Sequence, residues 1–374
     1  MGAVMPEVVL DLSNLRHGGA LQAASALLAD LSMVRPLPEW LHHCEVRVSS
    51  QVLDHLTVPQ DSIPGVLVAR ALSKSQIVAF PSRHDRRPTL RFRLFGPSYD
   101  MREARVEVMG FASGRLLFPE QLASGSYRVE SVRWKAEKRF KLWAARHADY
   151  YVVETSSVAR KLQTALSLDP ARIHVVHNEP HAVFRLPKVS VCRWTPGDPL
   201  VLIYPARAYR HKNHEIIPEV IRRSAAAHGI RANVHVTLRT EEWHTLKALQ
   251  INGVTNLGEL DPRGLAHAYS RAHAVFFPSL LEASSATPLE ARVQGLPLLG
   301  SDRSFVRESA GSASVFFEPT DVDSAVSALA TFSHTYPDLY ALGAADSATY
   351  RYELESYSRT RSLLRLIGSL LDSQ

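Results

Sequence analysis

Short runs of β-branched and apolar residues alternate along the chain with polar-faced segments of helical length. In the first half such runs are centred near residues 10, 47, 78, 93, 108, 153 and 175. A second series follows with "VLIYPAR", "NVHVTL", "VTNLGEL", "AVFFPS", "PLLGSD" and "SVFFEP". Because strands separated by helix-length crossovers pair in parallel, the pattern predicts an α/β fold with mostly parallel sheets.

The two series are separated by a segment without clear periodicity. Residues 178–199, "NEPHAVFRLPKVSVCRWTPGDP", contain four prolines and one glycine, a composition typical of a linker. We therefore expect two doubly wound, Rossmann-like domains facing across a cleft, at residues 1–190 and 191–350. Residues 351–374 then form a C-terminal helix that is a candidate to cross back to the first domain. Ligands of such sheets bind beyond the carboxyl ends of the strands.

Two helices can be predicted in some detail. The segment Thr287-Pro288-Leu289-Glu290 fits a capping box with Thr287 as N-cap, and Gly295 is expected to end that helix. The segment "YELESYSRTRSLLRLIGSLL" predicts a final amphipathic helix, whose apolar stripe consists of Leu363, Leu364, Ile367 and Leu370.

A third helix, "RWKAEKRFKLWAARHADYY", is strongly basic. It places Ala136, Phe140, Trp143 and Ala144 on one stripe with five cations around it. One interpretation is a crossover helix packed on the sheet with its charges in solvent, and we favour it from sequence. The other is docking on the anionic headgroups of a membrane, near a lipid-linked acceptor.

Length and composition indicate a folded protein of more than one domain, with 374 residues of which 45% are apolar. No apolar stretch approaches the roughly 20 residues of a membrane span, the start lacks a signal-peptide pattern, and Pro6 stands where myristoylation needs Ser or Thr. Cys44 and Cys192 are too far apart in sequence to suggest a disulfide framework or a zinc site. We expect a cytoplasmic protein. Peripheral docking on the inner face of the cell membrane is an alternative that the sequence leaves open.

The charge is uneven along the chain, whose formal net charge is +6. Residues 1–190 hold 25 Lys and Arg against 18 Asp and Glu, whereas the remainder holds 18 against 19. This excess favours an anionic partner for the first domain, such as a membrane surface, a lipid diphosphate or a nucleic acid. The commoner alternative is a basic face exposed to solvent. Nucleic acid is not expected, because neither a recognised binding module nor a stacking array is present.

The segment "PSLLEASSATPLEARVQGLPLLGSD", residues 278–302, holds two carboxylates, Glu282 and Glu290, eight positions apart. Between them, the small residues 283–286 allow close approach of a ligand to the backbone at a predicted helix N-terminus, where free amides bind phosphate. Ionised carboxylates accept hydrogen bonds from vicinal hydroxyl groups. The segment therefore predicts recognition of a sugar phosphate.

The segment "YPARAYRHKNHE", residues 204–215, follows a predicted strand. Arg207 and Lys212 would lie at the carboxyl end of that strand, where two cations neutralise a diphosphate and the charge that develops as a glycosyl bond breaks. The alternative is a solvated basic loop, since Arg210 and His211 belong to the same cluster.

Together these segments resemble the GT-B family of retaining, nucleotide-sugar-dependent glycosyltransferases, family four. That family carries an arginine and a lysine five positions apart after the first strand of its second domain, and then an E-x7-E motif. Arg207 with Lys212-Asn213 matches the first element, and Glu282 with Glu290 matches the second. The resemblance covers residues 200–330 and continues through Gly295, Pro297, Ser301-Asp302, Glu308, Gly311 and Pro319.

The first domain is similar to the family over a shorter stretch. "LDLSNLRHGGALQAASALLADL" is similar to its first strand, Gly-Gly loop and first helix, so Gly18 and Gly19 would bring backbone amides to the donor diphosphate. A tight turn is the alternative for this glycine pair. "LFGPSYDMREARVEVMGFASG" is similar to the branch that assembles surface polysaccharides.

The resemblance implies a role for each matched residue. Arg207 and Lys212 would hold the donor phosphates, Glu290 the ribose hydroxyls, and Glu282 the transferred sugar near its reacting end. Its catalytic set is Glu282, Arg207 and Lys212, and its donor-binding set is Glu290, Gly18, Gly19, Asn213, Ser285, Ala286 and Thr287. It also implies a hexosyltransferase-like enzyme that retains the anomeric configuration and needs no cofactor and no metal, because the nucleotide sugar is a substrate.

The sequence departs from the family in ways that leave the donor sugar open. Residues 283–285 are Ala-Ser-Ser where the family has Gly-Phe-Gly, and Ala206 replaces a glycine. Many relatives use a histidine of the first domain; we considered His84 and His147, but neither context matches, and we assign no role. We expect a transferase acting on a carbohydrate or lipid-linked glycan in cell-surface polysaccharide (O-antigen or capsule) synthesis. The alternatives are a non-catalytic scaffold that binds nucleotide sugar or glycan, or a related epimerase or phosphorylase.

Overall fold

A computed structural model describes residues 7–16, 18–63, 68–71, 88–96, 102–122, 132–185 and 192–373. The chain divides into two compact units. Unit 1 comprises Met1–Leu117, Glu130–His177 and Tyr357–Gln374, and unit 2 comprises Phe118–Val129 and Asn178–Ser356. Apart from the segment Phe118–Val129, the chain passes to unit 2 after His177, ahead of the boundary expected at residue 190, and it returns to unit 1 after Ser356.

Unit 1 is built on a parallel sheet whose described strands follow the order β3-β2-β1-β4-β5-β6-β7. These strands are β1 (Val8–Leu12), β2 (Cys44–Val48), β3 (Val68–Ala71), β4 (Leu90–Arg93), β5 (Val106–Gly110), β6 (Tyr150–Val153) and β7 (Ile173–Val175). The strand predicted near residue 78 lies outside the described residues, and β3 was not predicted. The other strands of this series were predicted.

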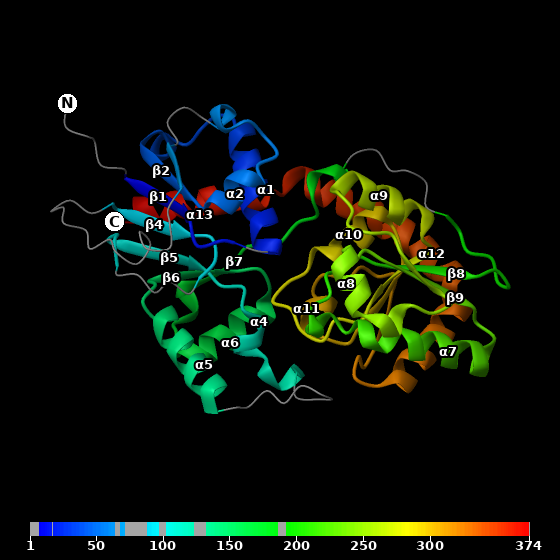
Figure 1. Ribbon diagram of the computed structural model, residues 1–374. Coiled ribbons are helices and arrows are strands. Elements are labelled where there is room, and N and C mark those ends of the chain that lie inside the picture. The colour runs from blue at the N-terminus through cyan, green and yellow to red at the C-terminus, as the bar shows by residue number, and fades with distance from the viewer. Residues whose placement is uncertain are drawn as a thin grey trace. The chain divides into compact units, whose positions relative to one another are not determined.

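Helices lie on both faces of this sheet (Figure 1). They are α1 (Gly19–Met33), α2 (Ser50–Asp54), α4 (Gly114–Leu117), α5 (Val132–Ala145), α6 (Ser156–Leu166) and α13 (Arg359–Asp372). The predicted stripe of α13 is confirmed, because its four apolar residues join the buried core with α1 and the inward side chains of β1, β2 and β4. The predicted helix over 352–371 is instead interrupted, and α13 begins anew at Arg359 with Ser358 as its N-cap.

The opposite face of the sheet carries buried charges. Asp11 of β1 accepts hydrogen bonds from Arg93 Nη2 at 2.7 Å and from Arg93 Nε at 3.1 Å. Arg91 Nε donates to Glu107 Oε2 at 2.7 Å, and Glu103 Oε2 lies 3.3 Å from Arg91 Nη1. Because charges removed from water are costly unless paired, each of these buried charges has a partner on a neighbouring strand or on the segment before β5.

Helix α5 does not pack as the sequence suggested. Its buried residues are Trp134, Ala144 and Ala145, whereas Phe140 is 53% exposed and Trp143 is 58% exposed. The favoured interpretation of a helix with its charges in solvent agrees with this burial, but the predicted stripe does not form one buried face, because Phe140 and Trp143 are exposed. The physical reason is phase: the helix turns 100° per residue, so residues 134 and 145 lie opposite residues 140 and 143.

Unit 2 contains a second parallel sheet, with the strand order β10-β9-β8-β11-β12-β13. Its strands, all predicted, are β8 (Leu200–Tyr204), β9 (Ala232–Val236), β10 (Val254–Asn256), β11 (Ala274–Phe277), β12 (Leu298–Ser301) and β13 (Ser314–Phe317). Its helices are α7 (Ile217–His228), α8 (Thr240–Thr245), α9 (Pro262–Arg271), α10 (Ala286–Gln294), α11 (Ser304–Arg307) and α12 (Val322–Ser356). Across the described residues of both units, every helix is too short or too polar to cross a membrane.

Candidate active site

The topology of unit 2 creates one natural ligand position. From β8 the chain runs outward through β9 and β10, and it then returns to the other side of β8 to form β11, β12 and β13. The carboxyl ends of β8 and β11 therefore flank a topological switch point, where ligands of doubly wound sheets bind. The loops after these two strands are joined, because Leu280 N donates to His211 O at 2.7 Å and Asn213 Nδ2 donates to Pro278 O at 3.2 Å.

An ion pair lies at this switch point. Lys212 Nζ is 2.7 Å from Glu282 Oε1, and the two side chains are only 15% and 12% exposed. Tyr204 fixes the lysine backbone, since its hydroxyl donates to Lys212 O at 2.6 Å. The fold thus brings together one cation and one acid that the sequence predicted to act together.

Two histidines near Lys212 are held neutral. Burial, followed by the charge of Lys212, lowers the pKa of His211 and of His214 to about 4 in each case. His214 also stacks against Tyr204, with ring centroids 4.8 Å apart. At neutral pH these two histidines carry no charge, so the positive charge that faces Glu282 comes from Lys212.

Arg207 contacts a different pair of acids. Its Nε donates to Glu242 Oε1 at 2.8 Å, and its Nη1 lies 3.9 Å from Glu259 Oε1. Sequence reasoning missed Glu242 and Glu259, although Glu242 stands three residues after Arg239 at the start of a helix that follows a predicted strand. That spacing is the signal of a helix-capping acid, and the backbone N of Arg239 does donate to Glu242 Oε2 at 3.0 Å.

The predicted capping box at α10 is wrong. The helix begins at Ala286 with Ser285 as N-cap and without a side-chain cap, so Thr287 lies inside the first turn. The third residue after this N-cap is Pro288, so Glu290 does not stand at the position of a capping-box acid. Its Oε2 instead accepts a hydrogen bond from Tyr269 Oη at 2.7 Å. The predicted end of the helix is confirmed, since Gly295 adopts φ 67° as its C-cap.

Glu290 is a buried carboxyl without a cation in contact among the described residues. Burial raises its pKa to about 7, and the hydrogen bond from Tyr269 only partly offsets that rise. Burial and the neighbouring Glu290 also raise the pKa of Tyr269 well above its usual range. Tyr269 comes from α9 and was missed from sequence, because no spacing rule links it to Glu290. Ribose binding by Glu290 remains a prediction.

The other predicted donor-binding residues fall into three places. Asn213 donates from Nδ2 to the carbonyls of Pro278 and Pro319, so its amide already ties loops together. Ser285, Ala286 and Thr287 form the N-terminal end of α10, where backbone amides lack partners within the helix.

Gly18 and Gly19 belong to unit 1, whereas the residues described above belong to unit 2. Gly18 has φ 64° and precedes α1, of which Gly19 is the first residue, so the backbone here needs a residue without a side chain at position 18. His147 stacks edge-on against Trp143 at 4.7 Å, and His84 lies outside the described residues. The donor role of the glycine pair stays a prediction.

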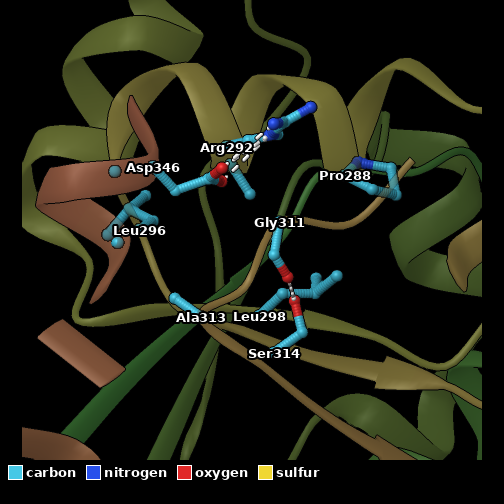
Figure 2. Close-up of a pocket in the computed structure, with 11 residues that line it drawn as sticks. Pro288, Arg292, Leu296, Leu298, Gly311, Ala313, Ser314 and Asp346 are labelled. Carbon is cyan, nitrogen blue, oxygen red and sulfur yellow. Dashed lines mark hydrogen bonds and ion pairs between the residues drawn. The ribbon is translucent and has the colours of Figure 1, made fainter. Parts of the chain in front are cut away.

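A separate small pocket lies between α10, α12 and the last two strands (Figure 2). Its empty space amounts to about 210 Å³, and this space includes open solvent. Arg292 and Asp346 both line it and pair with each other, with N–O distances of 2.9 to 3.1 Å. Because Lys212, Arg207 and both predicted glutamates are absent from its lining, we regard it as a packing feature.

Within the part of the chain that the structure describes, His, Cys, Asp and Glu nowhere gather in a group of three or more suited to a metal ion.

Comparison with known proteins agrees with the topology. Residues 194–344, about two fifths of the chain, match the family model described as Glycosyl transferases group 1. That match contains Arg207, Lys212, Glu282 and Glu290. No curated protein sequence matches the chain.

Several solved structures resemble the whole chain. A glycosyltransferase from Rickettsia africae ESF-5 is 12% identical with a TM-score of 0.67, and sucrose-phosphate synthase from Thermosynechococcus elongatus is 14% identical with a TM-score of 0.65. HepE from Anabaena, solved with UDP and glucose, is 12% identical with a TM-score of 0.64. Each comparison covers 99% of this chain and 100% of the other. The protein therefore has the two-unit, Rossmann-like GT-B fold.

Proposed function

We propose that the protein is a retaining, hexosyltransferase-like glycosyltransferase of family four, which moves a sugar from a nucleoside diphosphate sugar to a hydroxyl group of a carbohydrate. The observation that carries this proposal is the ion pair between Lys212 and Glu282 at the switch point of unit 2. It lies inside the segment that matches the glycosyl transferases group 1 model. The UDP and glucose bound to HepE support a nucleotide-sugar donor.

In the proposed reaction, the cations of the site stabilise the diphosphate that leaves. The bond between the anomeric carbon and the diphosphate oxygen breaks, and its electron pair stays on that oxygen. The ammonium group of Lys212 has three N–H donors, so it can contact Glu282 and a phosphate oxygen at once. It would stabilise the negative charge of the leaving diphosphate, together with Arg207 and the amides at the start of α10.

Retention follows if the acceptor attacks on the face that the diphosphate leaves. The acceptor oxygen then bonds to the anomeric carbon, and its proton passes to the departing phosphate oxygen. Glu282, held by Lys212, would orient the hydroxyl groups of the transferred sugar, which a carboxylate does by accepting their hydrogen bonds. This mechanism uses protein cations in place of a divalent metal and needs no cofactor.

For the acceptor we propose a glycan, including a lipid-linked one, in cell-surface polysaccharide biosynthesis. Two structural neighbours support this setting by their descriptions: WaaG as a glycosyltransferase involved in lipopolysaccharide biosynthesis, and WaaB as a lipopolysaccharide outer core galactosyltransferase. Their TM-scores are 0.63 and 0.56, at 14% identity each.

An anionic membrane surface is the second partner that we propose, in keeping with a cytoplasmic enzyme that docks on the inner face of the membrane. On α5, Phe140 and Trp143 stack at 5.8 Å, and Trp143 contacts His147 edge-on. With Val132 and Ala136 these residues recur every three or four positions and are exposed, so they form one outward stripe. Basic residues flank the stripe, as expected for a helix that lies in the headgroup layer; those exposed to solvent are Arg133, Lys135, Arg139 and Arg146.

Donor turnover is the direct test of the enzymatic proposal. Nucleotide sugars are first screened by thermal shift, because a ligand at 100 times its Kd stabilises a fold by about 2.7 kcal/mol. Release of the nucleoside diphosphate is then measured for the protein and for Glu282→Gln and Lys212→Ala. We expect turnover that falls by about a hundredfold or more in both variants. Turnover that both variants retain would contradict the proposed site.

The same experiment separates the enzyme from a scaffold that binds nucleotide sugar without reaction. Such a scaffold would show a thermal shift with one donor but no release of nucleoside diphosphate in the presence of any glycan acceptor. The anomeric configuration of the product, read by NMR, tests retention separately.

A further inference from the structure

Arg207 has an environment that the comparison with its family did not lead us to expect. Four side chains from the carboxyl ends of three neighbouring strands form one cluster in unit 2: Arg207 after β8, Arg239 and Glu242 after β9, and Glu259 after β10. Arg239 pairs with Glu259 through Nε at 2.8 Å and through Nη2. The two positive and two negative charges cancel, so the cluster as a whole attracts no ligand by net charge.

The contact between Arg207 and Glu242 uses only one edge of the guanidinium. Nε donates to Glu242 Oε1 at 2.8 Å, and the same oxygen accepts from the backbone N of Ala208 at 3.2 Å. Among the described residues, neither terminal nitrogen of Arg207 makes a hydrogen bond; the nearest acid to Nη1 is Glu259, at 3.9 Å. The side chain is 35% exposed, so these nitrogens remain open to a ligand.

The position of Glu242 is itself fixed. Its Oε2 accepts from the backbone N of Arg239 and thereby caps α8, while its Oε1 holds Arg207 and Ala208. The carboxylate is only 17% exposed. Hydrogen bonds from one backbone amide on each side of the contact hold the carboxylate in place, and that arrangement preorganises the arginine instead of competing for it.

We infer that Glu242 is a positioning residue for the diphosphate: it anchors Arg207 through Nε so that the two terminal nitrogens present a fork to phosphate oxygens. This inference rests on the proposed function, because it assigns the arginine a phosphate ligand. An arginine fork matches two oxygens of a phosphate, and holding it in place before binding reduces the entropy lost on binding.

A double-mutant cycle tests the inference, with UDP and inorganic pyrophosphate as probes in isothermal titration calorimetry. Glu242→Ala is expected to weaken binding of the probes by about tenfold in the otherwise unchanged protein, but by less than about twofold when Arg207→Ala is also present. Glu242→Gln has a single amide oxygen, which can accept from Arg207 Nε but cannot also accept from the Arg239 amide that Glu242 Oε2 caps. It should therefore weaken binding by less than Glu242→Ala does, to within about threefold of the wild type. Glu241→Ala, an exposed acid in the same helical turn, is the matched control and should change nothing.

Three results would overturn the inference. Glu242→Ala could weaken binding by the same factor with and without Arg207, which would show that it acts through the shape of the loop. Glu242→Gln could tighten binding, which would show that the acid competes with phosphate. A wild-type protein that binds neither probe would overturn the proposed function as well, so the two failures are distinguishable.

Discussion

At the scale of single residues, Glu290 links burial to a pH dependence. Its folded pKa of about 7 exceeds the value of about 4.3 in an unfolded chain, so the folded state binds the extra proton. Protonation of Glu290 therefore stabilises the folded state fully below about pH 4.3, and this stabilisation is lost as the pH rises through about 7. Over that window the loss of stability amounts to roughly 4 kcal/mol.

Glu290→Gln removes this titration while it keeps a hydrogen-bond acceptor for Tyr269. We therefore expect the variant to gain stability relative to the wild type as the pH rises from 5 to 8, measured by urea unfolding at each pH. Glu355→Gln, an exposed position on α12, is the control. A constant difference between Glu290→Gln and the wild type at all pH values would contradict the buried, protonated carboxyl.

Asp11 predicts the opposite pH dependence in unit 1. Burial alone would raise its pKa, but Arg93, Ser13 and Arg91 outweigh burial and lower the pKa to about 2. Its contribution is therefore present above the unfolded value of about 3.9 and is lost as the pH falls toward 2. At pH 7, Asp11→Ala should cost about 3–5 kcal/mol of unfolding free energy, because it removes the carboxylate that accepts two hydrogen bonds from the buried Arg93.

The measurement for Asp11 is urea unfolding followed by circular dichroism at pH 7 and pH 3. Asp11→Ala should differ most from the wild type at pH 7. Glu137→Ala, which removes an exposed acid of α5, should change little at either pH. Equal effects of the two substitutions would mean that the buried network does not stabilise the sheet.

At the scale of elements, the sequence predicted best what depends on local pattern. Apolar runs predicted every described strand except β3, and the spacing of apolar residues predicted the buried stripe of α13. Both signals arise because burial selects apolar residues on one face of an element. The phase of α5 and the start of α10 could not be predicted in the same way. At the start of α10, Glu290 contacts Tyr269 from another helix. On α5, the buried ring of Trp134 lies 3.9 Å from the guanidinium carbon of Arg115 in α4. The candidate site divides likewise: motif spacing predicted Lys212 and Glu282, but not the acids that hold Arg207.

At two glycines within helices, substitution by alanine is expected to change the stability of the protein in opposite directions. A Cβ on Gly343 of α12 would lie 2.7 Å from the carbonyl oxygen of Gly295 at the end of α10, whereas a Cβ on Gly368 of α13 would meet only Trp40 Nε1 at 3.5 Å. Alanine is favoured over glycine in a helix by about 1 kcal/mol. Gly368→Ala should therefore stabilise the protein by about that amount.

Gly343→Ala should instead destabilise, because the clash with backbone costs about 1–3 kcal/mol or more and outweighs the propensity gain. Thermal unfolding of the two variants side by side is the measurement. If Gly343→Ala raised Tm as Gly368→Ala does, the close approach of α10 and α12 would be refuted.

At the scale of the whole molecule, the excess of positive charge occurs in the same part of the chain as a stripe of exposed aromatic side chains. The surplus lies within residues 1–190, and α5 presents an aromatic stripe between basic flanks in that segment. Self-association through this face is disfavoured, because two copies would bring like charges together. An anionic lipid surface satisfies both the cations and the exposed rings.

Co-sedimentation with vesicles tests this surface. The wild type should bind vesicles that contain phosphatidylglycerol at low salt, and it should bind pure phosphatidylcholine weakly. Each basic residue near an anionic surface contributes about 1 kcal/mol, so Arg133→Gln, Arg139→Gln and Arg146→Gln combined should weaken binding by about a hundredfold. Phe140→Ser with Trp143→Ser should also weaken it, whereas Tyr352→Ser removes an aromatic ring that is 76% exposed in unit 2 and should not. At 0.1 M salt, charges are screened over about 10 Å, so an electrostatic attachment must weaken as salt is added. Binding that depends on neither lipid charge nor salt would contradict the proposal. Binding that both sets of substitutions on α5 leave unchanged would place any membrane contact elsewhere.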